Sequence, residues 1–335
     1  MSRDLRRRLC RGLAQLFSNI PQREPAMKLH SLYPLMFRPI YKDVFWGGNA
    51  IAETFNRPHT PRPCAESWEL CALEGDDSLV ANGVFEGMSL SELTRIFGRD
   101  LVGDKAPEAD VFPLLFKLVD VRGRCSVQVH PDLETSQRLG VLPKHELWYI
   151  LKAEPGSELW AGVADGPEQL DGITGRLFRH ETRAGDVFDI PPGLVHALGG
   201  GNLVFEVQQS SSAAFRIDDW DHGREVHPAA AMASIDWQAR PGIYPEPPCN
   251  RRDLRPRVTT PDFSFATLDL RRMRTLRTTS QSFMVLFCER GKATLGHDGP
   301  HPLTLLPGDL VLVPPKQQVT LSPLAEKTHL LMTTL

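Results

Sequence analysis

The sequence predicts a mainly β protein built from two related β-barrels. Residues 185–196 and 308–319 share one pattern, which is Gly-Asp, a short apolar strand and then Pro-Pro. Short candidate strands also recur about every ten residues between Pro and Gly, a spacing typical of sandwiches and barrels. At the position where the first copy has His196, the second has Val319. We therefore expect a metal site in the N-terminal barrel only.

The 335-residue chain is long enough for two or three domain-sized units. Residues 1–30 form a basic extension, interpreted either as an amphipathic or targeting segment or as a poorly ordered leader before Met27. We expect a catalytic, metal-binding domain at residues 31–239, a Pro-rich linker at 240–262 and a degenerate second barrel at 263–335. Few and short helices are expected.

Local patterns predict the individual elements. Residues 89–97 begin with a capping serine and have helical spacing, and residues 228–235 open with proline, so both are predicted helices. Residues 112–119 are almost continuously apolar, which indicates a strand buried on both faces. The other predicted strands are residues 67–73, 126–130, 146–151, 187–190, 203–208 and 283–288.

Composition and charge exclude several classes of protein. The net charge of −3 gives no sign of a nucleic-acid partner, and no apolar run approaches the roughly 18 residues of a membrane span. The six cysteines form no CxxC pair, so we expect free thiols and a cytoplasmic protein. No Gly-rich nucleotide loop is present.

Four residues form a candidate metal constellation. Gln128 and His130 are two apart on a predicted strand and share a face. Glu146 begins the next strand, within reach if the two strands form a hairpin, and His196 follows the Pro-Pro-Gly turn of another. Two imidazoles, a carboxylate and an amide suit Zn²⁺, and also iron, manganese or cobalt. Either histidine alone would more simply be a hydrogen-bonded core residue; the set of four indicates metal.

The spacing Gly-x5-Pro-x-Gly-x2-His, ending at His196, is the second signature of cupin barrels. Together with residues 39–48, 66–69, 112–117, 126–132, 144–150 and 208–211, it makes the chain resemble the short bacterial form of type I phosphomannose isomerase. That resemblance implies an isomerase that interconverts mannose 6-phosphate and fructose 6-phosphate. It implies one Zn²⁺ held by Gln128, His130, Glu146 and His196. The pocket residues that it implies are Trp46, Glu66, Lys117, Ser126, Lys144 and Arg216.

The chain departs from the family pattern at three places. Ser212 replaces an acidic residue and Phe215 a tyrosine, just before Arg216. The stretch between residues 164 and 185 is too short for the helical domain of longer members. Leu198 stands where some long forms have tyrosine. The missing acid leaves the activity and the substrate range open.

Aldose–ketose isomerisation needs stabilisation of an enediolate and a base that carries a proton between C1 and C2. Lys144 lies two residues before Glu146 and is the candidate base, with His145, Asp219 and a metal-bound hydroxide left open. Arg216 is the candidate clamp for the enediolate or the phosphate. His145 should face away from the metal.

Two alternatives remain at this point. One is an Fe(II) cupin oxygenase, in which two histidines and one carboxylate hold the iron. The other is a non-catalytic cupin that binds sugar phosphates, which the missing acid at Ser212 would fit. The expected partner in every case except the oxygenase is a small phosphorylated sugar, and the sequence does not distinguish a monomer from a homodimer.

Overall fold

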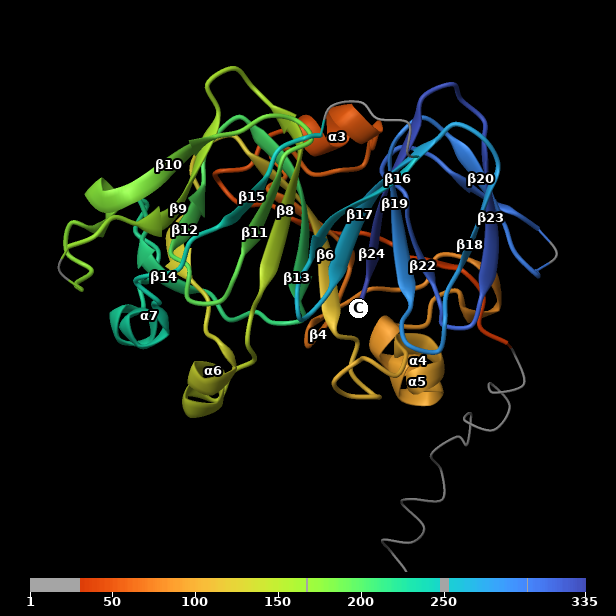
Figure 1. Cartoon of the computed structure of the whole chain (residues 1–335), viewed down its shortest axis with the longest axis horizontal. Helices are drawn as coiled ribbons and strands as arrows, with labels where there is room; N and C mark the ends of the chain where they lie inside the picture. Colours follow the sequence, from red (N-terminus) through yellow and green to blue (C-terminus); the bar gives the residue numbers. More distant parts are fainter. Residues whose placement is uncertain (1–30, 167, 248–252, 300) are drawn as a thin grey trace, which may run out of the picture. The chain divides into compact units, whose positions relative to one another are not determined.

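Antiparallel strands make up most of the regular secondary structure in the computed structural model, which confirms the mainly β prediction (Figure 1). The structure describes residues 31–166, 168–247, 253–299 and 301–335, so the expectations for residues 1–30 lie outside the described residues. Leu32–Leu335 pack as one unit. No helix in these described ranges has the length and apolar character to cross a bilayer.

Two sheets from the first part of the chain carry most of the predicted site residues. The larger has seven strands in the order β15 (Gly242–Tyr244), β11 (Val187–Ile190), β8 (Glu146–Ala153), β13 (Asn202–Gln209), β6 (Leu114–Val121), β3 (Glu66–Leu70) and β2 (Ile40–Lys42). The smaller has five strands in the order β10 (Leu177–Glu181), β9 (Glu158–Val163), β12 (His196–Leu198), β7 (Val127–Val129) and β14 (Phe215–Asp218).

A second pair of sheets is formed mainly by the last 80 or so residues. One has six strands in the order β1 (Leu35–Met36), β22 (Leu310–Val313), β19 (Met284–Arg290), β24 (Thr328–Thr334), β17 (Ser264–Leu270) and β16 (Leu254–Thr259). The other has four, in the order β18 (Arg274–Arg277), β23 (Gln318–Pro323), β20 (Ala293–Gly296) and β21 (Leu303–Leu305). Strands β4 (Ala72–Leu73) and β5 (Asp76–Asp77) form a separate hairpin.

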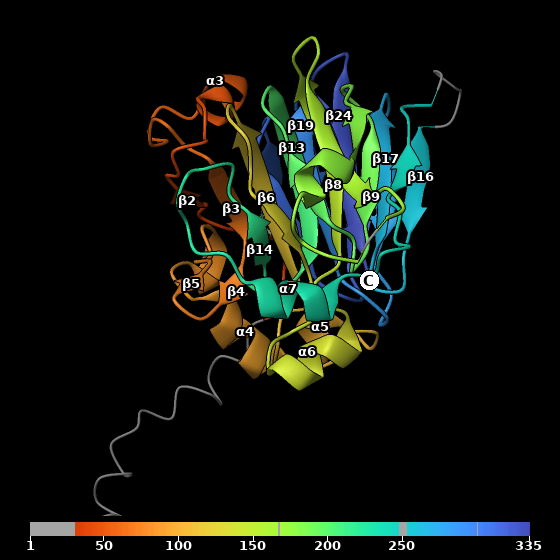
Figure 2. The ribbon, with the colours of Figure 1, turned by 90° about the vertical axis from the view of Figure 1, so that its left-hand side faces the viewer.

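The helices within the described residues are short and lie at the ends of the strands. They are α3 (Ala50–Phe55), α4 (Leu90–Phe97), α5 (Arg99–Val102), α6 (Leu133–Leu139) and α7 (Pro228–Ser234), with the 3₁₀ turns η1 (Gly83–Phe85) and η2 (Ile173–Arg176). Helices α4 to α7 lie at one end of the strands and α3 at the other (Figures 1 and 2). Ser89 caps α4 through a capping box with Glu92, as predicted. Helix α7 begins with proline, also as predicted.

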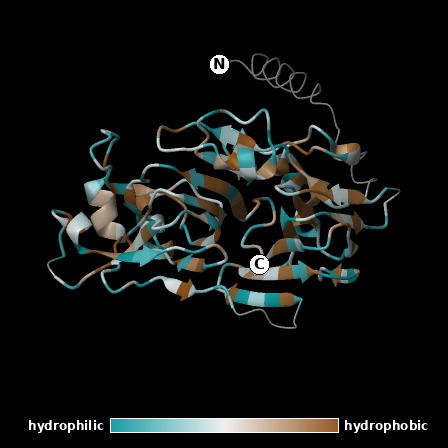
Figure 3. Cartoon of the chain, turned by 90° about the horizontal axis from the view of Figure 1, so that it is seen from above, coloured by the Kyte–Doolittle hydropathy of each residue, from teal (hydrophilic) through white to brown (hydrophobic). Residues whose placement is uncertain are grey.

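Alternate side chains along the central strands pack into two different hydrophobic cores. On β6, Phe116 and Leu118 pack toward the six-stranded sheet, whereas Val119 and Val121 pack toward the five-stranded sheet. The strand is buried along its whole length, which explains its nearly continuous apolar sequence. Apolar colour accordingly concentrates on the inner strands and polar colour on the outer loops (Figure 3). Polar residues at inward positions of these strands therefore stand out as functional candidates.

The two repeated segments occupy equivalent places. Strand β11 lies in the seven-stranded sheet and leads to β12 in the five-stranded sheet; β22 lies in the six-stranded sheet and leads to β23 in the four-stranded sheet. His196 is therefore matched by Val319, which is buried in the core of the second pair, as predicted. The local duplication is thus visible in the fold. The division into two barrels and the domain limits stay predictions.

Several elements differ from the expectations. The predicted linker at residues 240–262 contains two strands, β15 paired with β11 and β16 paired with β17. Its prolines do not prevent this, because both strands lie at sheet edges. Strand β1 pairs with β22, so the start of the first region completes the second pair of sheets. Helix α6 was not predicted; Asp132 caps it through the backbone N–H of Thr135.

Candidate metal centre and substrate pocket

Three buried side chains converge at one point inside the first pair of sheets. Nε2 of His130 lies 3.2 Å from Oε1 of Glu146, and Nε2 of His196 lies 3.7 Å from Oε2 of the same carboxylate. One donor atom from each residue lies within 4.8 Å of the other two. Gln128 joins them, with Nε2 at 3.3 Å from Nε2 of His196. The four predicted ligands are therefore brought together.

The side chains converge although β7 and β8 do not form the hairpin on which the expected approach of Glu146 was conditional. Gln128 on β7 and His196 at the start of β12 are cross-strand partners in the five-stranded sheet. Glu146 begins β8 in the seven-stranded sheet, so it approaches from the opposite wall. These two strands do not pair because helix α6 intervenes between β7 and β8 and carries the chain from one sheet to the other. The donor atoms consequently meet across the interior rather than along one sheet.

The protonation states of these side chains favour the binding of a cation. Burial and the nearby Lys144 ammonium lower the pKa of His130 to about 3, and burial also lowers the pKa of His196. His196 donates from Nδ1 to the carbonyl oxygen of Leu194 at 2.9 Å, which leaves Nε2 as the acceptor. Burial opposes ionisation of Glu146, but Lys144 and His130 hold the pKa of Glu146 well below its usual value. Two neutral imidazoles thus face one carboxylate.

These groups also lack protein partners. Among the described residues, the two ring nitrogens of His130 have no hydrogen-bond partner, and Oε2 of Glu146 has none either. Buried polar atoms without partners are costly unless a ligand satisfies them. Two imidazoles, a carboxylate and a neighbouring amide form the mixed N/O donor set of a catalytic zinc site. The residues present therefore fit a divalent metal ion.

A pocket of about 300 Å³ opens onto this centre. Eight of the predicted site residues line it: Trp46, Glu66, Lys117, Ser126, Gln128, Lys144, Glu146 and Arg216. The two histidine ligand candidates do not appear in that lining and are buried beside it. Metal candidates and substrate candidates thus belong to one continuous site.

The floor of the pocket contains a row of residues in register across four strands. Lys117 on β6 is paired with Glu206 on β13 and with Trp68 on β3, and Glu206 is paired with Trp148 on β8. Nζ of Lys117 lies 3.2 Å from Glu206 and 3.4 Å from Glu66. Burial opposes the charge, but these carboxylates raise the pKa of Lys117. The lysine has the carboxylate partners that a buried charge requires.

Two charged lining residues were not predicted as site residues. Glu206 accepts from Nε1 of Trp148 at 3.0 Å, and burial together with Glu146 raises its pKa. The available signal was an acidic residue at an inward position of an apolar strand. Arg224 lines the pocket from the loop that follows β14. Its only signal was position within the family-like stretch that follows Arg216.

The departures from the family pattern also lie at this site. Ser212 and Leu198 line the pocket, so both substitutions alter its wall. Phe215 packs beside a smaller apolar cluster instead. His145 faces away from the metal centre, as predicted, and contacts Asp189 and Asp262 at 2.7 Å each. The hydrogen bonds of these two carboxylates outweigh burial and raise the pKa of His145 to about 9.

Comparison with known proteins identifies relatives with this sequence pattern and this fold. The model of the type I phosphomannose isomerase catalytic domain matches residues 35–146. The chain is 36% identical over 218 residues to the mannose-6-phosphate isomerase ManA of Bacillus subtilis, covering 61% of this chain and 68% of that protein. A crystal structure of the Bacillus subtilis mannose 6-phosphate isomerase aligns with a TM-score of 0.81 and 28% identity, over 91% of this chain and 100% of the other. A zinc-bound mannose 6-phosphate isomerase shares the fold, with a TM-score of 0.71 and 16% identity over 90% and 99% of the two chains.

Proposed function

This chain belongs to the type I phosphomannose isomerase family, and from that premise we propose that it interconverts mannose 6-phosphate and fructose 6-phosphate. The observation that carries the proposal is the meeting of His130, Glu146 and His196 at the base of a pocket that also contains lysine and arginine side chains. Such a pocket suits an anionic sugar that must be polarised at one end and held by its charge at the other.

We propose that Gln128, His130, Glu146 and His196 hold one zinc ion. The donor types, the burial of His130, Glu146 and His196, and the missing hydrogen-bond partners of the His130 ring and of Oε2 of Glu146 among the described residues support this assignment. The name of a zinc-bound structural neighbour agrees with it. When bound, the ion would supply a Lewis acid that stabilises negative charge on the sugar oxygens.

Lys144 and Arg216 are the proposed catalytic residues. Lys144 is buried, lines the pocket and contacts Glu146, so it can carry a proton between C1 and C2 of a sugar above the metal centre. Arg216 is the cross-strand partner of Gln128 and lies beside the metal centre on the five-stranded sheet. Its guanidinium can stabilise the charge that develops in the enediolate.

The remaining predicted residues surround the substrate. Lys117 and Glu66 form an ion pair in the pocket floor, and Trp68 donates to Glu66 from Nε1 at 2.6 Å. The buried indole nitrogen of Trp46 has no hydrogen-bond partner among the described residues. Together with Ser126, these groups can bind the hydroxyl groups of the sugar.

Family membership supports the isomerase over the other two hypotheses. An Fe(II) oxygenase would need no amide ligand and no cationic pocket, yet Gln128, Lys144 and Arg216 lie together here. The non-catalytic hypothesis rests on Ser212 alone, and the catalytic candidates around that position are in place. We also propose a cytoplasmic location; the four described cysteines are free, which agrees with a reducing compartment.

The test is a coupled isomerase assay on purified protein. We expect conversion of mannose 6-phosphate to fructose 6-phosphate, loss of activity on removal of metal with a chelator, and recovery with zinc. Oxygen consumption is measured in parallel to detect oxygenase chemistry. Binding of mannose 6-phosphate to the zinc-loaded protein with no product formed would reject the enzyme proposal.

A further inference from the structure

A tight loop follows β14, the strand that contributes Arg216 to the lining of the substrate pocket. Trp220 and Asp221 adopt φ of 52° and 64°, a left-handed conformation that costs non-glycine residues energy. The loop is fixed by Trp220, whose Nε1 donates to the carbonyl oxygen of Cys125 at 2.7 Å and whose ring lies 5.5 Å from that of Trp160. A strained conformation that is anchored this firmly suggests that the loop places a specific side chain.

That side chain is Arg224, which lines the pocket. Asp219 accepts from Nε of Arg224 at 2.8 Å and from Nη2 at 2.5 Å. The guanidinium also lies 5.2 Å from the ring of Phe45, within the range of a cation–π contact. Arg224 is therefore held in one orientation.

Arg216 reaches the same carboxylate. Its Nε lies 3.9 Å from Oδ1 of Asp219, the oxygen that Arg224 contacts, and is a buried donor without a hydrogen-bond partner among the described residues. Two guanidinium groups thus share one carboxylate at the pocket wall. Their mutual repulsion contributes, after burial, to the lowered pKa of Arg216. A bound anion would relieve that repulsion.

The other cations of the pocket are already neutralised. Lys117 lies between Glu66 and Glu206, at 3.4 and 3.2 Å, and Lys144 contacts Glu146 at 2.7 Å. Among the described lining residues, excess positive charge is therefore found at the arginine pair. Arginine forks bind the oxygens of phosphate in pairs, which single ammonium groups do less well.

We propose that Arg224, beside Arg216, binds the phosphate group of the substrate, with Asp219 as the positioning residue that fixes Arg224. The assignment rests on the proposed function, because it identifies the part of the site that recognises the phosphate. It makes Arg224 a specificity-determining residue: it selects phosphorylated sugars and takes no part in proton transfer.

The experiment measures phosphate binding separately from turnover. Inorganic phosphate is titrated into the zinc-loaded protein by calorimetry, and KM and kcat are measured for mannose 6-phosphate. For Arg224→Met we expect the Kd for phosphate and KM to rise at least about tenfold, because a charged hydrogen-bonding partner is lost, while kcat changes little. Arg183→Met removes an exposed arginine outside the pocket and should keep wild-type values.

Unchanged Kd and KM in a correctly folded Arg224→Met protein would overturn the assignment. If that variant does not fold, Arg224→Gln replaces it, since its amide can still donate to Asp219; wild-type phosphate binding there would overturn the assignment equally. Phosphate binding that depends on Arg224 in a protein that forms no fructose 6-phosphate would support the assignment and reject the isomerase proposal.

Discussion

Nζ of Lys144 lies 2.7 Å from Oε1 of Glu146, so the lysine proposed to move the proton contacts a carboxylate proposed to hold the metal. This contact keeps the ammonium at the metal end of the pocket. It also means that a change at Lys144 acts on the reaction and on a metal ligand candidate together. Activity and metal content must therefore be measured separately.

Lys144→Met tests this role. We expect kcat to fall by about 10²- to 10⁴-fold, the usual contribution of a positioned acid–base group, with zinc still bound. The measurements are kcat from the coupled assay and zinc content by mass spectrometry. Lys152→Met provides a matched control, because Lys152 is an exposed lysine on β8, the strand that follows Lys144. A kcat equal to that of the wild type would exclude Lys144 as the base.

His130→Ala tests the metal centre. We expect loss of zinc and of activity, because the substitution removes one of three converging donors. Zinc affinity is measured by competition with a chromophoric chelator. His180→Ala serves as the control, since Nε2 of His180 donates to the backbone carbonyl of Ala161 at 3.1 Å and His180 is not one of the converging donors. Stoichiometric zinc at unchanged affinity in His130→Ala would refute the ligand assignment.

The four metal candidates could be predicted because each carries a local signal. Gln128 and His130 follow the two-residue period of a strand, and His196 ends a turn with a fixed spacing of glycine and proline. The wall from which Glu146 approaches could not be predicted. Whether consecutive strands pair or face each other depends on the path of the chain between them, here through α6.

Glu206 and Arg224 show a second limit of prediction from the sequence. The importance of Glu206 arises from its register with Lys117 and Trp148, and register between distant strands is a tertiary property. Arg224 enters the pocket because a left-handed loop turns it inward, and the tryptophan that anchors this loop contacts a carbonyl 95 residues earlier in the chain. No periodic pattern in the sequence reports either relationship.

Lys117→Met tests the balance of charge in the pocket floor. Removing the ammonium leaves Glu66 and Glu206 without their cation, so we expect the free energy of unfolding to fall by about 3–5 kcal/mol. Urea denaturation at neutral pH measures the loss. The double variant with Glu206→Gln should recover part of it, because one carboxylate is then neutral. A single variant as stable as the wild type would contradict the ion-pair description.

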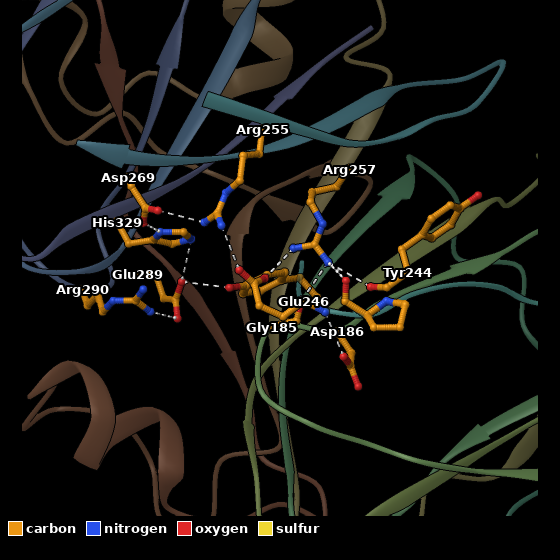
Figure 4. Close-up of polar contacts among 12 residues, drawn as sticks. Gly185, Asp186, Tyr244, Glu246, Arg255, Arg257, Asp269, Glu289, Arg290 and His329 are labelled. Atoms are coloured by element: carbon orange, nitrogen blue, oxygen red, sulfur yellow. Dashed lines mark hydrogen bonds and ion pairs between the residues drawn. The ribbon is translucent and has the colours of Figure 1, made fainter. Parts of the chain in front are cut away.

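His329 provides a pH prediction away from the metal centre. Figure 4 shows its ring between Asp269 and Glu289, with Nδ1 2.6 Å from Asp269 and Nε2 3.4 Å from Glu289. Burial lowers the pKa of His329 to about 4, with Arg290 adding to the effect and Asp269 opposing it. The folded protein therefore keeps this ring neutral at pH values where the unfolded chain protonates it.

The sign of the effect follows from proton binding. Between about pH 6.5 and 4 the unfolded chain binds more protons at His329 than the folded protein, so stability is complete above that range and falls as the pH decreases through it. The loss of stability from this group reaches up to about 3 kcal/mol, the free-energy equivalent of the difference in pKa.

Urea denaturation of metal-free wild type and His329→Gln from pH 7 to 4.5 measures this loss. Metal-free protein is used because the ligand candidates also protonate on acidification. The variant should lose less stability than the wild type over this range; parallel curves would show that His329 does not contribute to acid sensitivity.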